Sequence, residues 1–147
     1  MNCMSDKCFV DTNILVYAHD RSTGIKHERA RVLIEELWNS GKGVVSTQVL
    51  QELCINLRRK AENPLPVEEV RRLIREYSTW EVVTNTPGSV LGALEIETRY
   101  RTSFWDALIL QAAEEAGASI LYSEDLSSGE HYGATEVVNP LLDRKIV

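Results

Sequence analysis

The sequence predicts an α/β domain with a central, mostly parallel sheet of about four or five short strands. Short apolar segments alternate with longer segments whose apolar residues recur every three to four positions, which is the pattern of strands and amphipathic helices in turn. The 147 residues amount to about one domain, and no repeat or low-complexity segment divides them. We therefore expect residues 1–147 to form a single domain.

The strands are expected where short apolar runs are bounded by turn residues. The first, KCFVD at residues 7–11, is apolar up to its final aspartate and is therefore expected to be buried. The remaining strands are expected at residues 43–46, 80–84, 119–123 and 135–139.

The helices are expected between these strands, and several of their ends carry clear signals. Ser46 or Thr47 is a natural N-cap, Ser103 is another, and Pro87 suits a first helical turn. Gly117 is suited to end the last helix. The helices themselves are expected at residues 13–20, 26–40, 48–62, 67–79, 87–100 and 103–117.

The composition limits the class of protein. With 44% hydrophobic and 26% charged residues the chain resembles an ordinary globular protein. Its apolar runs are far shorter than the roughly 20 residues of a membrane helix, and its polar start lacks a signal peptide's apolar stretch, so a cytoplasmic protein is expected. A net charge of -6 argues against a protein that coats nucleic acid, but not against a nuclease that binds metal through carboxylates.

Four acidic residues fall where this topology would bring them to one edge of the sheet. Asp11 ends the first strand, Asp106 lies in the first turn of a helix, and Asp125 follows the strand ILYS. In a parallel sheet the carboxyl ends of strands and the amino ends of helices share an edge. Glu52 lies at the border of the apolar stripe of its helix.

Each acid also has a structural explanation. Asp11 would cap the next helix, and Asp106 has capping-box spacing from the serine before it. Glu52 would bond a neighbour one turn away, and Asp125 would start a turn. Four carboxylates at one edge would, however, repel each other unless a cation lay among them. Oxygen ligands of this kind suit Mg²⁺ or Mn²⁺ rather than zinc.

Three segments, in this order, carry a family resemblance: FVDTNILVYAHD, STQVLQEL and SFWDALILQAAEEAGASILYSEDL. The specific combination is the hydrophobic-Asp-Thr-Asn opening, the Trp-Asp-Ala helix and the Ser-x-Asp after a strand. In these features the chain resembles the PIN domain, and most closely the VapC-like ribonuclease toxins of toxin–antitoxin pairs. The resemblance implies a three-layer α/β/α fold.

The resemblance also implies a metal centre. Asp11, Glu52 and Asp106 match the acidic triad that holds Mg²⁺ or Mn²⁺, and Asp125 matches a fourth acid. The polar positions that support such a site correspond to Thr12, Asn13 and Ser123. The segment YSEDL has serine where threonine is commoner and places Glu124 beside Asp125, so both acids remain candidates, with the spacing favouring Asp125.

The implied activity is that of a metal-dependent endoribonuclease acting on single-stranded loops of structured RNA such as tRNA or ribosomal RNA. Cleavage would leave 5′-phosphate and 3′-hydroxyl ends. Arg99 and Arg101, just before the helix of Asp106, are the expected RNA contacts. The resemblance further implies a small antitoxin protein as partner and a homodimer.

Two other classes of protein stay open. A catalytically silent PIN-fold scaffold would bind RNA or a partner without cutting, and metal binding without turnover would favour it. A receiver-like signalling domain also gathers acids and Mg²⁺ at a strand edge. Such a domain needs an adjacent acid pair after the first strand and a lysine after the last, whereas this chain offers VDTN and only Lys145. Labelling of Asp11 by acetyl phosphate would favour it.

Overall fold

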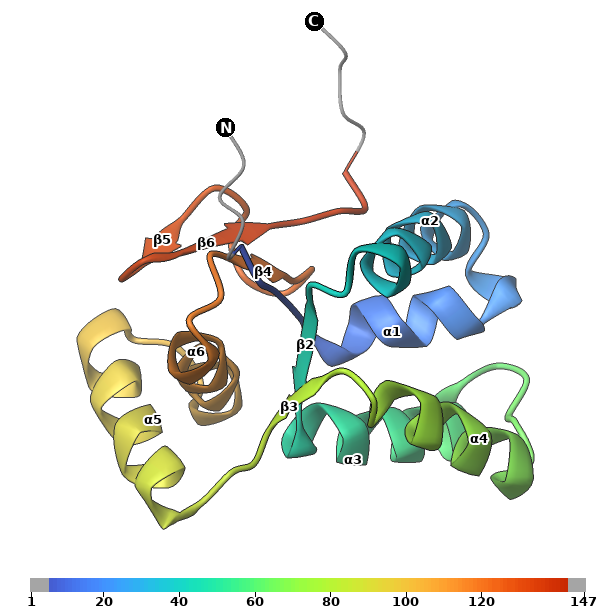
Figure 1. The fold of residues 1–147 in the computed structure, drawn as a ribbon, viewed down its shortest axis with the longest axis horizontal. Coiled ribbons are helices and arrows are strands. Elements are labelled where there is room, and N and C mark those ends of the chain that lie inside the picture. Colours follow the sequence, from blue (N-terminus) through green and yellow to red (C-terminus); the bar gives the residue numbers. More distant parts are fainter. Residues whose placement is uncertain (1–5, 143–147) are drawn as a thin grey trace, which may run out of the picture.

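A sheet between two layers of helices forms the protein in the computed structural model, which describes residues 6–142 (Figure 1). The strands are β1 (Cys8–Val10), β2 (Gly43–Ser46), β3 (Glu81–Val83), β4 (Ile120–Tyr122), β5 (His131–Tyr132) and β6 (Thr135–Val138). The helices are α1 (Thr12–His19), α2 (Ile25–Ser40), α3 (Thr47–Ile55), α4 (Val67–Tyr77), α5 (Pro87–Tyr100) and α6 (Phe104–Ala116). A 3₁₀ turn spans Arg21–Thr23, and a π-helical segment spans Asn56–Lys60.

The strands are arranged in the order β3-β2-β1-β4-β6-β5, and every neighbouring pair is parallel except β5 with β6. The expected α/β class and mostly parallel sheet are therefore confirmed. Within residues 6–142 the sheet has six strands, because β5 pairs antiparallel with β6. A strand of two residues is too short for its pattern to be recognised in a sequence.

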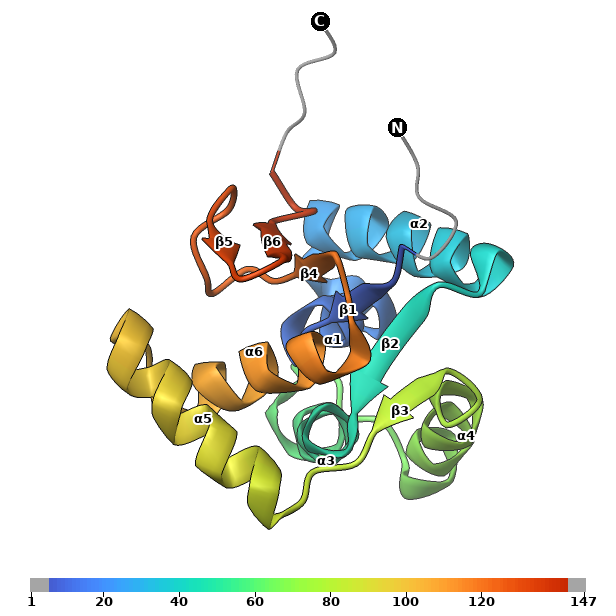
Figure 2. The same cartoon turned by 60° about the vertical axis from the view of Figure 1, so that its left-hand side comes forward.

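The direction of the strand connections decides which face each helix covers. The chain moves outward from β1 through β2 to β3, and α1 to α4 lie on one face of the sheet (Figures 1 and 2). It then returns past β2 and β1 to reach β4, and α5 and α6 lie on the other face. Right-handed crossovers produce this result, since reversing the direction of travel reverses the face. The three-layer α/β/α expectation is confirmed.

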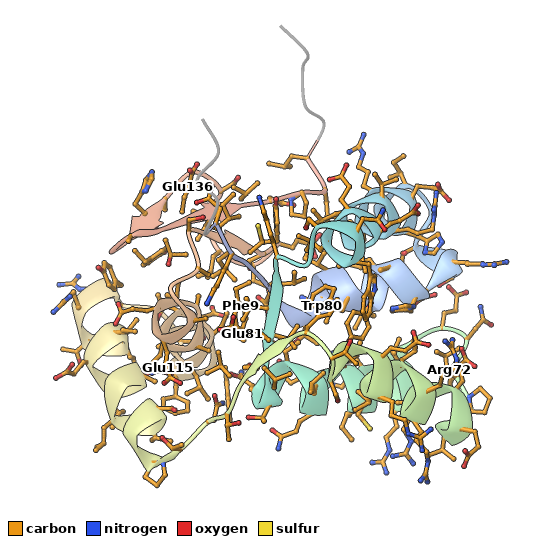
Figure 3. All side chains as sticks on the ribbon, viewed as in Figure 1. Phe9, Arg72, Trp80, Glu81, Glu115 and Glu136 are labelled. Carbon is orange, nitrogen blue, oxygen red and sulfur yellow. The ribbon has the colours of Figure 1, made fainter. Side chains whose placement is uncertain are left out.

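The core fills the space on both sides of the central strands. Phe9, Val10 and Leu121 are fully buried, as expected for parallel strands covered on both faces. Trp80 packs edge-on against Tyr77, with ring centroids 5.1 Å apart. Figure 3 shows Phe9 and Trp80 in the interior, whereas Arg72 lies on the outer side of α4.

The helix expected at residues 48–62 is interrupted. Its α-helical part ends at Ile55, and the chain continues as a wider π-helical segment in which the Ala61 N–H donates to the Asn56 carbonyl oxygen at 2.9 Å. Prolines follow in NPLP and prevent the helix from continuing. None of the helices in the described part of the chain has the length and hydropathy needed to cross a bilayer.

Candidate metal centre

The site lies at the carboxyl edge of β1 and β4, where Asp11 directly follows β1. Its backbone N–H donates to the Tyr122 carbonyl oxygen at 2.9 Å, which ties the end of β1 to the end of β4. The chain runs from β1 outward to β2 and β3 and returns to β4 on the other side of β1, so the strand order reverses between β1 and β4, and in open parallel sheets ligands bind at such a switch point. The topology therefore places the Asp11 carboxylate at the natural binding edge.

One cavity of about 450 Å³ at this edge brings the four predicted acids together. It is lined by Asp11, Thr12, Asn13, Gln48, Gln51, Glu52, Ile55, Asn56, Lys60, Trp105, Asp106, Ile109 and Asp125. The acids come from the end of β1, from α3, from the first turn of α6 and from the loop after β4. Residues more than 110 positions apart in the chain thus share one opening.

The predicted supporting residues hold these acids in place. Ser123, which has no exposed surface, donates its hydroxyl to Asp11 Oδ2 at 3.0 Å, and the Thr12 N–H donates to Asp11 Oδ1 at 2.7 Å. The Thr12 hydroxyl donates to Glu52 Oε1 at 2.7 Å. The Asn13 amide donates to Asp125 Oδ2 at 3.1 Å. Each bond satisfies a carboxylate oxygen and restricts its orientation.

Helix capping explains Asp11 in part and does not explain the carboxylate of Asp106. Asp11 does cap α1, but its carboxylate lines the cavity as well. For α6 the cap is Ser103, which accepts from the Asp106 N–H at 3.1 Å. The return bond of a capping box from Asp106 is not among the hydrogen bonds of the described residues. The Asp106 carboxylate is therefore left for the cavity.

The other two acids also differ from their structural explanations. Glu52 accepts from the Thr12 hydroxyl and, at 3.4 Å, from the Gln48 amide, which lies one turn earlier on α3. The turn that carries Asp125 is held by Ser123, whose hydroxyl oxygen accepts the N–H groups of Asp125 and Leu126 at 3.2 and 3.4 Å. Neither the Glu52 nor the Asp125 carboxylate is fully occupied by bonds within its own helix or turn.

Glu124 does not line the cavity and has other partners. Its carboxylate accepts from the Tyr17 hydroxyl and from Lys26 Nζ, both at 2.6 Å. Partial burial disfavours the charged form, but the hydrogen bonds from Lys26 and Tyr17 outweigh it and hold the pKa of Glu124 below its ordinary value. The choice left open between Glu124 and Asp125 is thus decided by placement: Asp125 faces the cavity.

Burial and the neighbouring acids raise the pKa values of Asp11 and Asp125. Burial raises the pKa of Asp11 to about 7, the charges of Asp125 and Glu52 add to the rise, and the bonds from Thr12 and Ser123 oppose it. The pKa of Asp125 is raised first by burial and then by the charge of Asp106. A cation placed among these groups would relieve the repulsion that opposes their ionisation.

The lining fits a hard divalent cation, because it contains four carboxylates and no His or Cys among the described residues. The described residues nevertheless contain no group of three or more His, Cys, Asp or Glu side chains already arranged to hold a metal ion. Thr12, Asn13 and Ser123 instead donate hydrogen bonds to oxygens of Glu52, Asp125 and Asp11.

Neither predicted arginine lines the cavity. Arg99 lies by a shallow depression on α5 with Leu94 and Glu95, and Arg101 is the left-handed C-cap of that helix, with φ 58°. RNA contact by these two residues stays a prediction. Lys145, which the receiver-like alternative would need, lies outside the described residues.

Sequence reasoning missed Gln48 and Asn56 as members of the lining, and it considered Lys60 as a basic contact but ranked it below Arg99 and Arg101. Gln48, Asn56 and Lys60 are spaced from Glu52 by four or eight residues, so the four positions form one row on α3 and the π-helical segment. An α-helical turn has about 3.6 residues, so residues four apart shift gradually around the helix. The π-helical turn holds more residues and shifts them back, which keeps the row on one side. This regular spacing of four residues is the sequence signal from which the row could have been predicted.

Fold and site together define a class: an α/β/α domain with carboxylates gathered at the carboxyl edge of a parallel sheet. The model of the PIN domain family matches residues 8–127, which is most of the chain. The chain therefore belongs to the PIN domain family. Receiver domains are a different family, so the receiver-like alternative is set aside. No curated protein matches the chain.

Solved structures share this fold. VapC20 of Mycobacterium tuberculosis, a toxin that cleaves the sarcin–ricin loop, is 23% identical with a TM-score of 0.63, over 81% of this chain and 90% of that one. A toxin–antitoxin complex from Klebsiella pneumoniae is 18% identical with a TM-score of 0.67, over 91% and 98%. PAE2754 of Pyrobaculum aerophilum is 21% identical with a TM-score of 0.52, over 84% and 77%. At these identities the likeness establishes the fold.

Proposed function

We propose that this PIN domain is a metal-dependent endoribonuclease and acts as the toxin of a toxin–antitoxin pair. The observation that carries the proposal is the convergence of Asp11, Glu52, Asp106 and Asp125 on one cavity. Carboxylates that only cap helices and start turns would have no reason to face the same opening. The structural likeness to VapC20, itself a toxin that cleaves RNA, supports the same activity.

The four acids would hold Mg²⁺ or Mn²⁺. When bound, such a metal lowers the pKa of a coordinated water and stabilises negative charge on the phosphate. The chain's own part is to position the carboxylates: Ser123 and Thr12 orient Asp11, Thr12 also orients Glu52, and Asn13 orients Asp125. Hydrolysis would leave 5′-phosphate and 3′-hydroxyl ends.

The substrate we propose is a single-stranded loop of a structured RNA such as tRNA or ribosomal RNA. Proteins that read RNA sequence mainly bind unstacked loop nucleotides, because the major groove of an RNA duplex is too narrow for side chains. An open, hollowed site of this size is compatible with a strand that bends into it.

The decisive experiment compares the wild-type protein with Asp106→Asn on a mixture of tRNA and ribosomal RNA, in Mg²⁺, Mn²⁺ or EDTA. Asparagine keeps the size of the side chain, and Ser103 still caps α6, so the fold should survive. We expect discrete fragments with wild-type protein and metal, none in EDTA, and a rate lower by about 100-fold or more in the variant, comparable to the loss of one group that stabilises transition-state charge.

Glu114→Gln serves as the matched control, because Glu114 is an exposed acid on the same helix and does not line the cavity. It should cut as the wild type does. Metal binding by wild-type protein without any cleavage would instead support the silent scaffold. If divalent metal changed neither cleavage nor melting temperature, the nuclease proposal would be wrong.

We further propose a small antitoxin as partner and a homodimer as the solution state. A toxin–antitoxin complex from Klebsiella pneumoniae has the same fold over 91% of this chain, which supports the first proposal. Co-expression with the product of the adjacent gene should yield a complex that no longer cleaves RNA. Light scattering during gel filtration tests the dimer, and a mass near 16.6 kDa would contradict it.

A further inference from the structure

Trp105 is an exposed aromatic residue at the cavity. It directly precedes Asp106 and is 62% exposed, while the ring of its neighbour Phe104 packs into the core beside α5 and α6. Single exposed apolar residues are common and need no explanation, and Leu91 is more exposed still. Trp105 differs because it lines the cavity that holds four acids, and its exposed ring contacts only Phe104 among the rings of the described residues.

Lys60 is the one cation among the described residues that line this cavity. It has no ion-pair or hydrogen-bond partner in the described part of the chain, although four carboxylates share the opening with it. A solvated lysine at the end of a helix is the ordinary alternative. Arg59, next to it on the π-helical segment, is exposed and does not line the cavity.

Gln48 supplies an independent indication that the cavity takes a ligand. Its side chain lines the cavity, it is only 4% exposed, and its Oε1 is buried without a hydrogen-bond partner among the described residues. Its Nε2 makes only long contacts, to Glu52 Oε2 at 3.4 Å and to the Trp105 carbonyl oxygen at 3.5 Å. Buried acceptors are normally satisfied, so a donor is missing from this wall.

We infer that Trp105 and Lys60 form a subsite for a single-stranded RNA segment beside the acids, with a base stacked on the Trp105 indole and a phosphate further along the strand at the Lys60 ammonium group. Once turned toward the cavity, the unpaired Gln48 oxygen would accept a hydrogen bond from a ribose hydroxyl or a base amino group. The inference rests on the proposed nuclease function and deepens it. An exposed aromatic residue and an unpaired cation that line the same cavity are a combination that binds single strands, whose bases are free to stack on protein.

This subsite would select the substrate as well as hold it. In a duplex both faces of a base are already covered by its neighbours, so Trp105 would have nothing to stack on. Stacking tolerates every base, because each has a π-face. The subsite therefore favours unpaired RNA without specifying its sequence.

The test measures binding separately from cleavage. A fluorescently labelled RNA of about ten nucleotides, single-stranded or annealed to its complement, is titrated with full-length protein in Ca²⁺, and each sample is checked on a gel for intact RNA. We expect Trp105→Ala to weaken single-strand binding about 5- to 150-fold, the range for losing one base–aromatic stack. Trp105→Phe, which keeps a stacking ring, should restore most of it.

Lys60→Ala should weaken binding and reduce the slope of log affinity against log salt by about 0.7, the value for one phosphate contact on a single strand. Two matched controls, Arg59→Ala on the same segment and Leu91→Ala, an equally exposed apolar residue on α5, should leave the ratio of single-strand to duplex affinity unchanged.

The outcomes separate the two proposals. If wild-type protein cuts RNA in Mg²⁺ but Trp105→Ala and Lys60→Ala bind as wild type does, the subsite is refuted and the nuclease stands. If nothing is cut but single-strand binding depends on both residues, the subsite stands and the nuclease does not. Equal affinity for single strand and duplex would also refute the subsite.

Discussion

Two neighbouring residues, Glu124 and Asp125, show how environment separates side chains of the same chemistry. Glu124 is bound by Tyr17 and Lys26 outside the cavity, whereas Asp125 faces the cavity and shares it with Asp106. Their spacing in the sequence favoured Asp125 but left Glu124 as a candidate. In the structure the two side chains are separated by direction: they lie on the turn held by Ser123 and point to different surroundings.

The first prediction follows from this separation. Asp125→Asn should lower the affinity for Mn²⁺ at least tenfold in isothermal titration, because a charged oxygen ligand is lost from the centre. Glu124→Gln should change the affinity less than threefold, since the Tyr17 hydroxyl can still donate to the amide oxygen. The reverse ranking would show that Glu124 turns into the cavity when metal arrives.

The second prediction concerns Asp11 in the metal-free protein. Its pKa is about 7 in the folded state and 3.8 ordinarily, so the folded state binds the proton more tightly than the unfolded state. The associated stability is fully present below about pH 4, and it is lost as the pH rises through about 7. The change is on the order of 2–4 kcal/mol, from about 1.4 kcal/mol for each pKa unit.

Thermal unfolding in EDTA between pH 5 and pH 8 measures this effect. Melting temperature should fall with rising pH in the wild type and less steeply in Asp11→Asn, whose side chain does not ionise. Glu36→Gln, an exposed acid outside the cavity, is the control and should follow the wild type. Mg²⁺ should raise the melting temperature more at pH 8 than at pH 6, because protons compete with the metal. A flat wild-type profile would contradict the prediction.

At the scale of elements, the contact of β2 with the chain before β3 depends on a glycine. A Cβ on Gly43 would lie 2.6 Å from ring atoms of Trp80, which is held by Tyr77 and Trp38. The aromatic ring therefore packs directly on the backbone of β2. The sequence marks this glycine only as the end of a turn, GKG.

The third prediction is that Gly43→Ala lowers the free energy of unfolding by about 1–3 kcal/mol, the usual cost of overpacking. Gly88→Ala is the matched control: a Cβ there would be 3.5 Å from the nearest atom, Thr86 Oγ1, and the position is helical. Its effect should be neutral or stabilising by up to about 1 kcal/mol. Urea denaturation compares the two, and equal effects would mean that Trp80 shifts at little cost.

The element pattern was largely readable from the sequence, and the site only in part. The apolar runs predicted every strand except β5, and Ser46, Ser103 and Gly117 end or begin helices as expected. The π-helical segment was missed, because residues 48–62 carry one continuous helical pattern. The same continuous pattern hid the place of Asn56 in the lining, whereas Lys60 was considered as a basic contact and ranked below Arg99 and Arg101.

At the scale of the whole molecule, the site depends on the packing of β4 between β1 and β6. Leu121 has no exposed surface and lies two residues before Ser123, so its packing helps to hold β4 where Asp11 needs it. The cavity is consequently a property of the assembled sheet. No single helix or strand contains it.

The fourth prediction is that Leu121→Ala lowers the free energy of unfolding by about 2–5 kcal/mol and lowers cleavage with it, since it leaves a void in the core. Leu91→Ala removes the same atoms from an exposed position on α5 and should cost less than about 0.5 kcal/mol. Chemical denaturation followed by fluorescence measures both. A small effect of Leu121→Ala would mean that the core collapses around the void.

The sequence by itself determined the α/β class and nearly all helix and strand positions, because periodicity and caps are local properties. Its family resemblance supplied the four acids with Thr12, Asn13 and Ser123 as the predicted site. Only the tertiary structure decided that the acids share one cavity, that Asp125 rather than Glu124 faces it, and that Trp105 and Lys60 border it. Those facts depend on contacts between residues far apart in the chain. Such contacts arise when the crossovers and the sheet order bring separate elements to the same edge.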